Sequence, residues 1–218
     1  MASGSAICNG TRHTDIVELT STTGKVWMDR NLGATRVATS ATDYMAYGCL
    51  YQWGRGNDGH ASITWTSATA GTPVNGSTTT LATTDTPGDA LFIISYSSGY
   101  DWRSGNNNTL WQAGLQVNNP CPSGFHVPTN AEFTDEFISY GVVNSTAAFT
   151  NGPSSGFKLV TPGYRNSLSI LTDLGLRALY WSSSTANAYS YYRSIRSDSE
   201  SAYDAERSAG LSVRCIKD

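Results

Sequence analysis

The chain has 218 residues and a formal net charge of −3, from 14 Lys and Arg against 17 Asp and Glu. Charged residues make up 14% of it and aromatic residues 11%. This composition excludes extended disorder, because the aromatic side chains can bury surface and no strong net charge holds the chain open. It also excludes a general nucleic-acid binder, since a net acidic chain lacks the positive charge that phosphates need.

The length suits one fairly large domain or two small ones. No linker or repeat divides the chain, so we expect a single domain over residues 7–218. Residues 1–6 lack the basic and apolar regions of a targeting signal, and we interpret them as an added segment or the remnant of a leader. The longest apolar run, 90–95, is far short of the roughly 20 residues that span a bilayer. No membrane insertion is therefore expected.

The first predicted element is a β-hairpin. Short apolar runs at 16–19 and 25–28 flank a turn-forming segment rich in Ser, Thr and Gly. A helix is predicted next, over residues 41–53, because bulky side chains recur there at helical spacing. Ser40 would cap its start and Gly54 would end it.

Residues 57–118 are rich in Thr, Ser, Gly and Asn, and we expect an ordered loop region held by its tryptophans. The clearest local signal follows. Thr129 and Glu132 form a capping box that predicts a helix ending near Gly141. Short aromatic or β-branched runs then predict strands at 157–160, 179–181, 191–195 and 211–216. Two helices among many short, mostly antiparallel strands with long ordered loops predict an α+β fold.

The four cysteines are widely spaced and show no zinc-ligand spacing. Their even number, together with few lysines and many small polar residues, favours one or two disulfides in an extracellular or cell-surface protein. Three pairings are possible in principle. The alternative is four small buried thiols in a cytosolic protein.

Six segments together resemble one family. The chain resembles the Fibrobacter succinogenes major paralogous domain, a surface-associated branch of the C-type lectin-like fold related to formylglycine-generating enzyme. The segments are 27–33 (WMDRNLG), 47–55 (YGCLYQWGR), 119–129 (NPCPSGFHVPT), 162–166 (PGYRN), 180–184 (YWSSS) and 210–215 (GLSVRC). They run in order over nearly the whole chain. The resemblance implies a C-type lectin-like fold and a disulfide between Cys121 and Cys215, with Cys8–Cys49 possible by elimination.

The same terminal pattern is used by variable proteins of diversity-generating retroelements, whose last coding segment is rewritten at adenines. The resemblance therefore implies a ligand-binding display protein whose C-terminal segment, about residues 180–208, is a diversified binding surface. Its partner would be an unidentified protein or other macromolecule, and the protein itself a monomer. The alternatives are an undiversified adhesion or structural module of the same family and, less favoured, an enzyme of the formylglycine-generating type.

Independently of the resemblance, the amino-acid composition of residues 180–208 favours a ligand-binding role. It is rich in Tyr and Ser, which give contact area and adaptable hydrogen bonds in binding surfaces. The alternative is a solvent-exposed hairpin whose polar side chains have no binding role. If Ile195 faces the core, strand alternation puts Arg193 on the same side and Tyr192 on the other. The candidate ligand-binding residues are Tyr180, Tyr189, Tyr191, Tyr192, Arg193, Ser194, Arg196, Asp198, Ser199, Tyr203 and Asp204.

The sequence gives little support for a metal site or a catalytic site. The carboxylate and amide tripeptides with which lectins of this fold bind calcium are absent, so no metal or cofactor is predicted. Asp58 could join an ion site, but its Asn-Asp-Gly setting favours a simple turn. His13, His60 and His126 are isolated in the sequence, and no nucleophile and base can be placed together. We therefore predict no enzyme activity.

Overall fold

Strands dominate the structure, a computed structural model that describes residues 5–8, 12–96, 100–112, 114–115, 117–154 and 156–218. Most of the predicted leader segment, residues 1–6, lies outside these ranges. Within them the chain forms many short strands and only two short helices. The fold is sheet-rich with few helices, and the predicted α+β, C-type lectin-like class built on two helices is wrong.

The predicted helix at 41–53 accounts for much of this error. Asp43 caps a single 3-10 turn, η1 (Tyr44–Ala46), by accepting from the Met45 backbone NH. Gly48 then takes the left-handed conformation at φ +75°, where an added Cβ would lie 2.3 Å from the Leu32 carbonyl oxygen. A helix cannot continue through this residue, and the chain enters a sheet at Tyr51.

Two four-stranded sheets and one three-stranded sheet organise the chain. The first runs in the order β10 (Phe125–His126), β17 (Ile216–Lys217), β4 (Val26–Met28) and β3 (Glu18–Thr20). The second runs in the order β12 (Leu171–Thr172), β11 (Tyr164–Arg165), β16 (Gly210–Leu211) and β5 (Tyr51–Gln52). The third comprises β13 (Ala178–Ala186), β14 (Tyr189–Ile195) and β15 (Glu200–Ala205).

Three further two-stranded sheets complete the β-structure of the described residues. They are β1 (Ser5–Ile7) with β2 (Arg12–Thr14), β6 (Ile63–Ser67) with β7 (Ala70–Pro73), and β8 (Ser77–Thr78) with β9 (Phe92–Ile93). The last pair is parallel. The predicted first hairpin is confirmed by the antiparallel pairing of β3 with β4. The predicted strand at 157–160 does not form, and that at 211–216 is a strand only at its two ends.

Helix α1 (Asn130–Tyr140) confirms the capping box. Thr129 Oγ1 accepts from the Glu132 backbone NH, and the Glu132 carboxylate accepts from the Thr129 backbone NH. Gly141 ends the helix in the left-handed conformation at φ 62°. His126 and Lys25 also bond to the Glu132 carboxylate, so the helix start is tied to β10 and to the residue before β4. Helix α2 (Ser145–Thr150), capped by Asn144, was not predicted.

The polar region 57–118 is held by its tryptophans, as expected. Trp102 is fully buried and donates from its indole nitrogen to the Trp53 carbonyl at 2.6 Å. Trp111 is buried too, and donates to the Arg55 and Asn118 carbonyls. These bonds fix loops that have little regular structure of their own.

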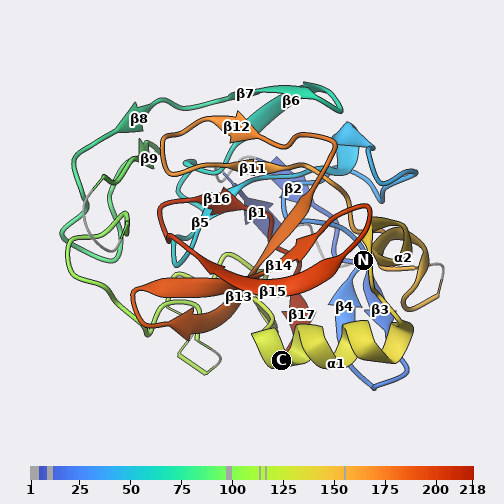
Figure 1. Ribbon diagram of the computed structural model, residues 1–218. Helices are drawn as coiled ribbons and strands as arrows, with labels where there is room; N and C mark the ends of the chain where they lie inside the picture. The colour runs from blue at the N-terminus through green and yellow to red at the C-terminus, as the bar shows by residue number, and fades with distance from the viewer. Residues whose placement is uncertain (1–4, 9–11, 97–99, 113, 116, 155) are drawn as a thin grey trace.

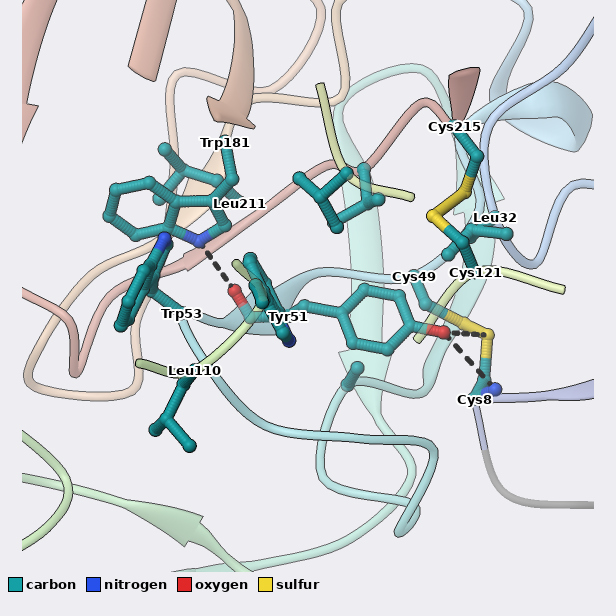
Figure 2. Packing of buried hydrophobic residues seen from close by; sticks show 14 of the residues in the cluster. Cys8, Leu32, Cys49, Tyr51, Trp53, Leu110, Cys121, Trp181, Leu211 and Cys215 are labelled. Carbon is teal, nitrogen blue, oxygen red and sulfur yellow. Dashed lines mark hydrogen bonds between the residues drawn. A yellow bond between two sulfur atoms is a disulfide. The ribbon is translucent and has the colours of Figure 1, made fainter. Parts of the chain in front are cut away.

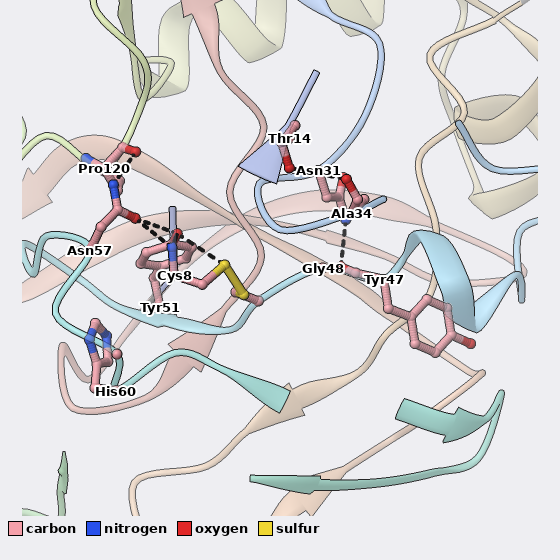
Figure 3. The surroundings of a disulfide bond; sticks show 12 residues. Cys8, Thr14, Asn31, Ala34, Tyr47, Gly48, Tyr51, Asn57, His60 and Pro120 are labelled. Atoms are coloured by element: carbon pink, nitrogen blue, oxygen red, sulfur yellow. Dashed lines mark hydrogen bonds between the residues drawn. A yellow bond between two sulfur atoms is a disulfide. The ribbon is translucent and has the colours of Figure 1, made fainter. Parts of the chain in front are cut away.

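Two disulfides join distant parts of the chain. Cys121 and Cys215 are bonded with their Cα atoms 5.9 Å apart, which confirms the implied pairing. Cys8 and Cys49 form the second bond. Asn57 and the Tyr51 hydroxyl both accept from the Cys8 backbone NH, and Figure 3 shows this bond network around the second disulfide.

The third sheet separates two hydrophobic clusters. Leu179 and Trp181 of β13 belong to the larger cluster, where Trp181 packs with Trp53 and donates to the Tyr51 carbonyl at 2.8 Å (Figure 2). Tyr180 of β13 and Ile195 of β14 belong to the other cluster, with the buried face of α1. In Figure 1 the third sheet crosses the molecule beside α1, with β15 outermost in its strand order. Strands β13 and β14 therefore pack against a hydrophobic cluster on each face over part of their length, whereas β15 is an edge strand.

No helix within the described ranges combines the length and the apolar character that crossing a membrane requires.

Candidate ligand-binding surface

An aromatic row crosses the third sheet from the core to the solvent. Trp181, Tyr192 and Tyr203 are direct cross-strand partners on β13, β14 and β15. The Trp181 and Tyr192 rings meet edge-on with centroids 6.1 Å apart, and the Tyr192 and Tyr203 rings lie 6.1 Å apart at 34°. Trp181 is fully buried, whereas Tyr203 is 52% exposed. The row gives the edge of the sheet a rigid aromatic surface.

A hollow of about 380 Å³ opens beside this row. Its apolar lining comes from Leu179 and Leu211 together with Ala205 and Ala209. The aromatic and charged lining residues are Tyr164, Arg177, Tyr189, Tyr192, Asp204 and Glu206. Tyr164 of β11 and Leu211 of β16, both from the second sheet, therefore meet the third sheet here.

Two tyrosines of the hollow, Tyr164 and Tyr192, have raised pKa values. Burial raises the pKa of Tyr192, with the nearby Arg177 acting in the opposite direction. Burial and the charge of Asp173 raise the pKa of Tyr164, again opposed by Arg177. Both hydroxyl groups can thus donate as well as accept hydrogen bonds.

Arg177 is held at the edge of the hollow by three neighbours. Its Nη1 lies 3.0 Å from the Asp173 carboxylate, and its Nη2 donates to the Ser194 hydroxyl at 3.0 Å. The Arg177 side chain also hydrogen-bonds to the Tyr192 hydroxyl.

The predicted site residues do not all reach this surface. Tyr180 is fully buried, and its hydroxyl bonds to the backbone of Val160, donating to the carbonyl at 3.2 Å and accepting from the NH at 3.0 Å. Ser194 is buried beneath Arg177. The structure therefore places Tyr180 and Ser194 in its interior, bonded to other residues of the chain, and not on the exposed surface with the other predicted residues.

Arg193 is also a structural residue. Strand alternation is confirmed, since Arg193 shares with Ile195 the face that packs on α1, where its guanidinium lies over the Phe137 ring. It forms a bidentate ion pair with Glu200, in which Nε and Nη2 donate to the two carboxylate oxygens at 2.6 and 2.7 Å. It further donates to Asn130 and Thr134 of α1. The buried charge is thus fully partnered within the protein.

The remaining predicted residues form two groups. Tyr189, Tyr192 and Asp204 line the hollow, and Tyr203 extends it along the aromatic row. Arg196, Asp198 and Ser199 lie exposed in the turn between β14 and β15, beside other depressions of the surface. Tyr189, Tyr191 and Tyr192 are half-buried, so Tyr203 is the exposed tyrosine among the predicted residues.

The sequence did not identify three of the aromatic and charged residues of the hollow. Tyr164 stands in a segment interpreted only as part of the family pattern, and Arg177 precedes β13 in a stretch that carries no motif. Glu206 lies at the end of the polar C-terminal segment but was not singled out. An arginine immediately before an apolar strand was the available signal for Arg177, although it does not indicate which surface the side chain reaches.

Asp58, His60 and His126 are held by hydrogen bonds within the fold. Asp58 accepts from Arg55 at 2.7 Å and is bonded to the ring of His60, which supports the turn interpretation. Burial lowers the pKa of His60 to about 4. His126 lies between Glu132 and Asp218, and the side chain of His13 is not described. No group of three or more His, Cys, Asp or Glu that could hold a metal ion occurs within the described ranges.

Comparison of the chain with protein-family models, with curated proteins and with solved structures finds no match.

Proposed function

We propose that this protein is a ligand-binding display protein that holds a macromolecular partner on the outer edge of its third sheet. The observation that carries the proposal is the aromatic row that ends at the exposed Tyr203 beside a tyrosine-lined hollow. Concave sites with aromatic walls and a few polar groups are typical of binding sites. Tyrosines also give large contact area at low entropic cost.

Buried contacts beneath this surface favour a role in which the exposed side chains vary on a fixed scaffold. Trp181 anchors the inner end of the row in the larger cluster, and Arg193 with Glu200 fixes β14 to β15. Side chains at the edge can therefore change while the strands beneath them keep their packing. The variable positions would be Tyr189, Tyr191, Tyr192, Arg196, Asp198, Ser199, Tyr203 and Asp204.

In this proposal only the accessible positions of residues 180–208 are diversified, in the way that the resemblance to variable proteins of diversity-generating retroelements implies. Tyr180, Arg193 and Ser194 belong to the fixed scaffold in this proposal, because each has buried partners that other side chains would not satisfy. The two disulfides favour an extracellular or cell-surface location, where such bonds persist.

A pair of combinatorial libraries on the yeast surface tests the proposal. The first library varies positions 189, 191, 196, 198, 199 and 203 among Tyr, Ser, Asp, Ala and Asn, and the second varies 180, 193 and 194 in the same way. We expect most members of the first library to resist protease like the parent chain and most members of the second to be cleaved. Protease sensitivity throughout the first library would contradict the proposal.

Binding is then tested by sorting the first library against two unrelated purified proteins. Display predicts clones specific for each, with binding unchanged in excess EDTA because the surface has no metal cluster within the described residues. Clones that bind both proteins equally, or none that bind, would argue against a display surface. A reverse-transcriptase gene beside a near-copy of the last coding segment would establish natural diversification.

A further inference from the structure

Strand β15 has an open edge in the described part of the chain. It stands last in the sheet order β13-β14-β15, and its six residues pair with β14 on one side. No strand of the described residues pairs with it on the other side. Residues 202–204 are exposed, so the main chain of this edge is accessible to a partner.

A hydrogen bond in the adjoining turn shows which main-chain groups of β15 point outwards. The Arg196 NH donates to the Ser199 carbonyl at 2.8 Å, so these two residues form a hydrogen-bonded pair of the ladder. Such pairs alternate with non-hydrogen-bonded pairs along two antiparallel strands. Counted from Ser199 along the register, Ala202 and Asp204 stand in non-hydrogen-bonded pairs. Their NH and C=O groups therefore point away from β14.

Strand β15 lacks the features that protect most edge strands from further pairing. Proteins usually protect an edge with Lys or Pro, with a β-bulge or with a very short strand. The six residues of β15 include neither Lys nor Pro, and they pair with β14 without a register shift. Tyr203, at the end of the aromatic row, presents a half-exposed ring that a neighbouring strand would cover.

The face of β15 that carries Glu200 borders a groove of about 510 Å³. Exposed apolar side chains of Ile138 and Val143, at the end of α1 and just after it, line this groove together with Glu200. Strand alternation places Ala202 on the same face as Glu200, and Tyr203 on the opposite face. In strand addition the main chain supplies affinity, and such contacts select alternate side chains of the added strand.

The charges along this edge favour a basic partner over a second copy of the chain. All charged residues between positions 197 and 206 are acidic. Glu200 is paired with Arg193 at 2.6 Å, whereas Asp204 is exposed. Antiparallel self-pairing would bring two such acidic segments together, and like charges on neighbouring strands are destabilising. A strand with Lys or Arg opposite Asp204 gains an ion pair instead.

We propose that β15 binds an extended segment of a protein partner as a fourth strand of the third sheet. The outward NH and C=O groups of Ala202 and Asp204 pair with the main chain of this segment. Its residue opposite Tyr203 is aromatic and continues the row, and the adjacent residue opposite Asp204 is Lys or Arg. This proposal rests on the proposed display surface and names the way in which that surface holds its partner.

Two variants at Ala202 test the main-chain contacts. Ala202→Pro removes an outward NH and leaves the bonds to β14, so the chain should stay folded. Ala202→Val is the matched control, because it adds similar bulk and keeps the NH. The probe is a library of random nine-residue peptides on phage, selected against the intact, oxidised protein. Enriched peptides should carry an aromatic residue beside Lys or Arg. They should bind Ala202→Val like the parent and Ala202→Pro at least about tenfold more weakly.

Modified copies of the strongest peptide test the same bonds on the unaltered protein. An added strand directs every second NH towards β15. N-methylation of that set should abolish binding, whereas N-methylation of the other set should leave it unchanged. The peptide should also slow hydrogen exchange of the Ala202 and Asp204 amides at least about tenfold, with little change at the Tyr203 amide, which already bonds to β14.

Charge variants test the basic residue of the partner. Asp204→Asn should weaken binding of the selected peptides about threefold, since an accessible ion pair contributes modestly. Asp198→Asn removes the same charge from the turn before β15 and should leave binding unchanged. A one-dimensional NMR spectrum checks that each variant is folded.

The proposal is overturned if no peptide is enriched, if the enriched peptides bind Ala202→Pro as tightly as the parent, or if both N-methylated sets bind equally. A dimer of the parent chain in sedimentation that Ala202→Pro abolishes would assign this edge to a second copy and overturn it too. Failure here leaves the display proposal standing when clones from the yeast libraries keep their specific binding after Ala202→Pro. Failure of both tests removes the binding role of this edge altogether.

Discussion

Replacing Arg193 with methionine separates a structural role from a binding role for this buried cation. The change removes the ion pair with Glu200 and leaves that carboxylate, whose side chain is 9% exposed, without its partner. Removing one member of a buried pair costs about 3 to 5 kcal/mol, because the remaining charge is uncompensated. We expect about 3 kcal/mol here, since Glu200 lies on the edge strand and can partly reach water.

Urea unfolding followed by tryptophan fluorescence measures this change under non-reducing conditions. In a chain of this length, a loss of that size lowers the melting temperature by about 6 to 12 °C. The double variant Arg193→Met, Glu200→Met should recover most of the stability, because it removes both charges. Arg196→Met, in the exposed turn, is the matched control and should change stability by no more than about 0.5 kcal/mol.

Two results would refute the reasoning. If Arg193→Met is as mild as the Arg196 control, then the ion pair contributes nothing and Arg193 is free to serve a ligand. If the double variant is as unstable as the single one, the loss comes from packing against α1 rather than from the unpaired carboxylate.

Three further outcomes are expected. Replacing Cys121 and Cys215 with serine should cost about 4 to 5 kcal/mol in urea unfolding, since the bond joins residues 94 apart, and a loss under 1 kcal/mol would contradict this. Trp181→Ala should cost about 3 to 5 kcal/mol because the ring is fully buried, whereas Tyr203→Ala at the exposed end should cost about 1 kcal/mol or less; equal losses would argue against the row. Burial by itself would raise the pKa of Glu132, but its histidine, threonine and lysine partners lower it to about 2. Its stabilisation is therefore present above the unfolded pKa of about 4.5 and is lost as the pH falls toward 2, so Glu132→Gln should flatten the acid side of the stability profile measured by urea unfolding. An unchanged acid slope in that variant would count against the assignment.

The sequence by itself determined the features that depend on near neighbours. Helix α1 follows from a capping box in which Thr129 and Glu132 satisfy each other's backbone groups three residues apart, with Gly141 supplying the left-handed stop. The hairpin of β3 and β4 likewise follows from two apolar runs and one short turn. Alternation along β14 correctly put Arg193 and Ile195 on one face, because the period of a strand is a local property.

Only the tertiary structure decided which distant segments pack against these local elements. Apolar spacing at 41–53 predicted a helix, yet the close approach of Gly48 to the Leu32 carbonyl and the bond of Cys49 to Cys8 hold that segment in an irregular path. Alternation placed Arg193 on the core-facing side of its strand, but it could not show that Asn130 and Thr134, 63 and 59 residues away, meet it there. The hollow combines Tyr164 with Tyr192 only because β11 and β14 meet through long-range packing. Hydrogen bonds within a turn are encoded by the residues that make them, whereas contacts between distant strands depend on the whole chain, and the candidate site is built from contacts of the second kind.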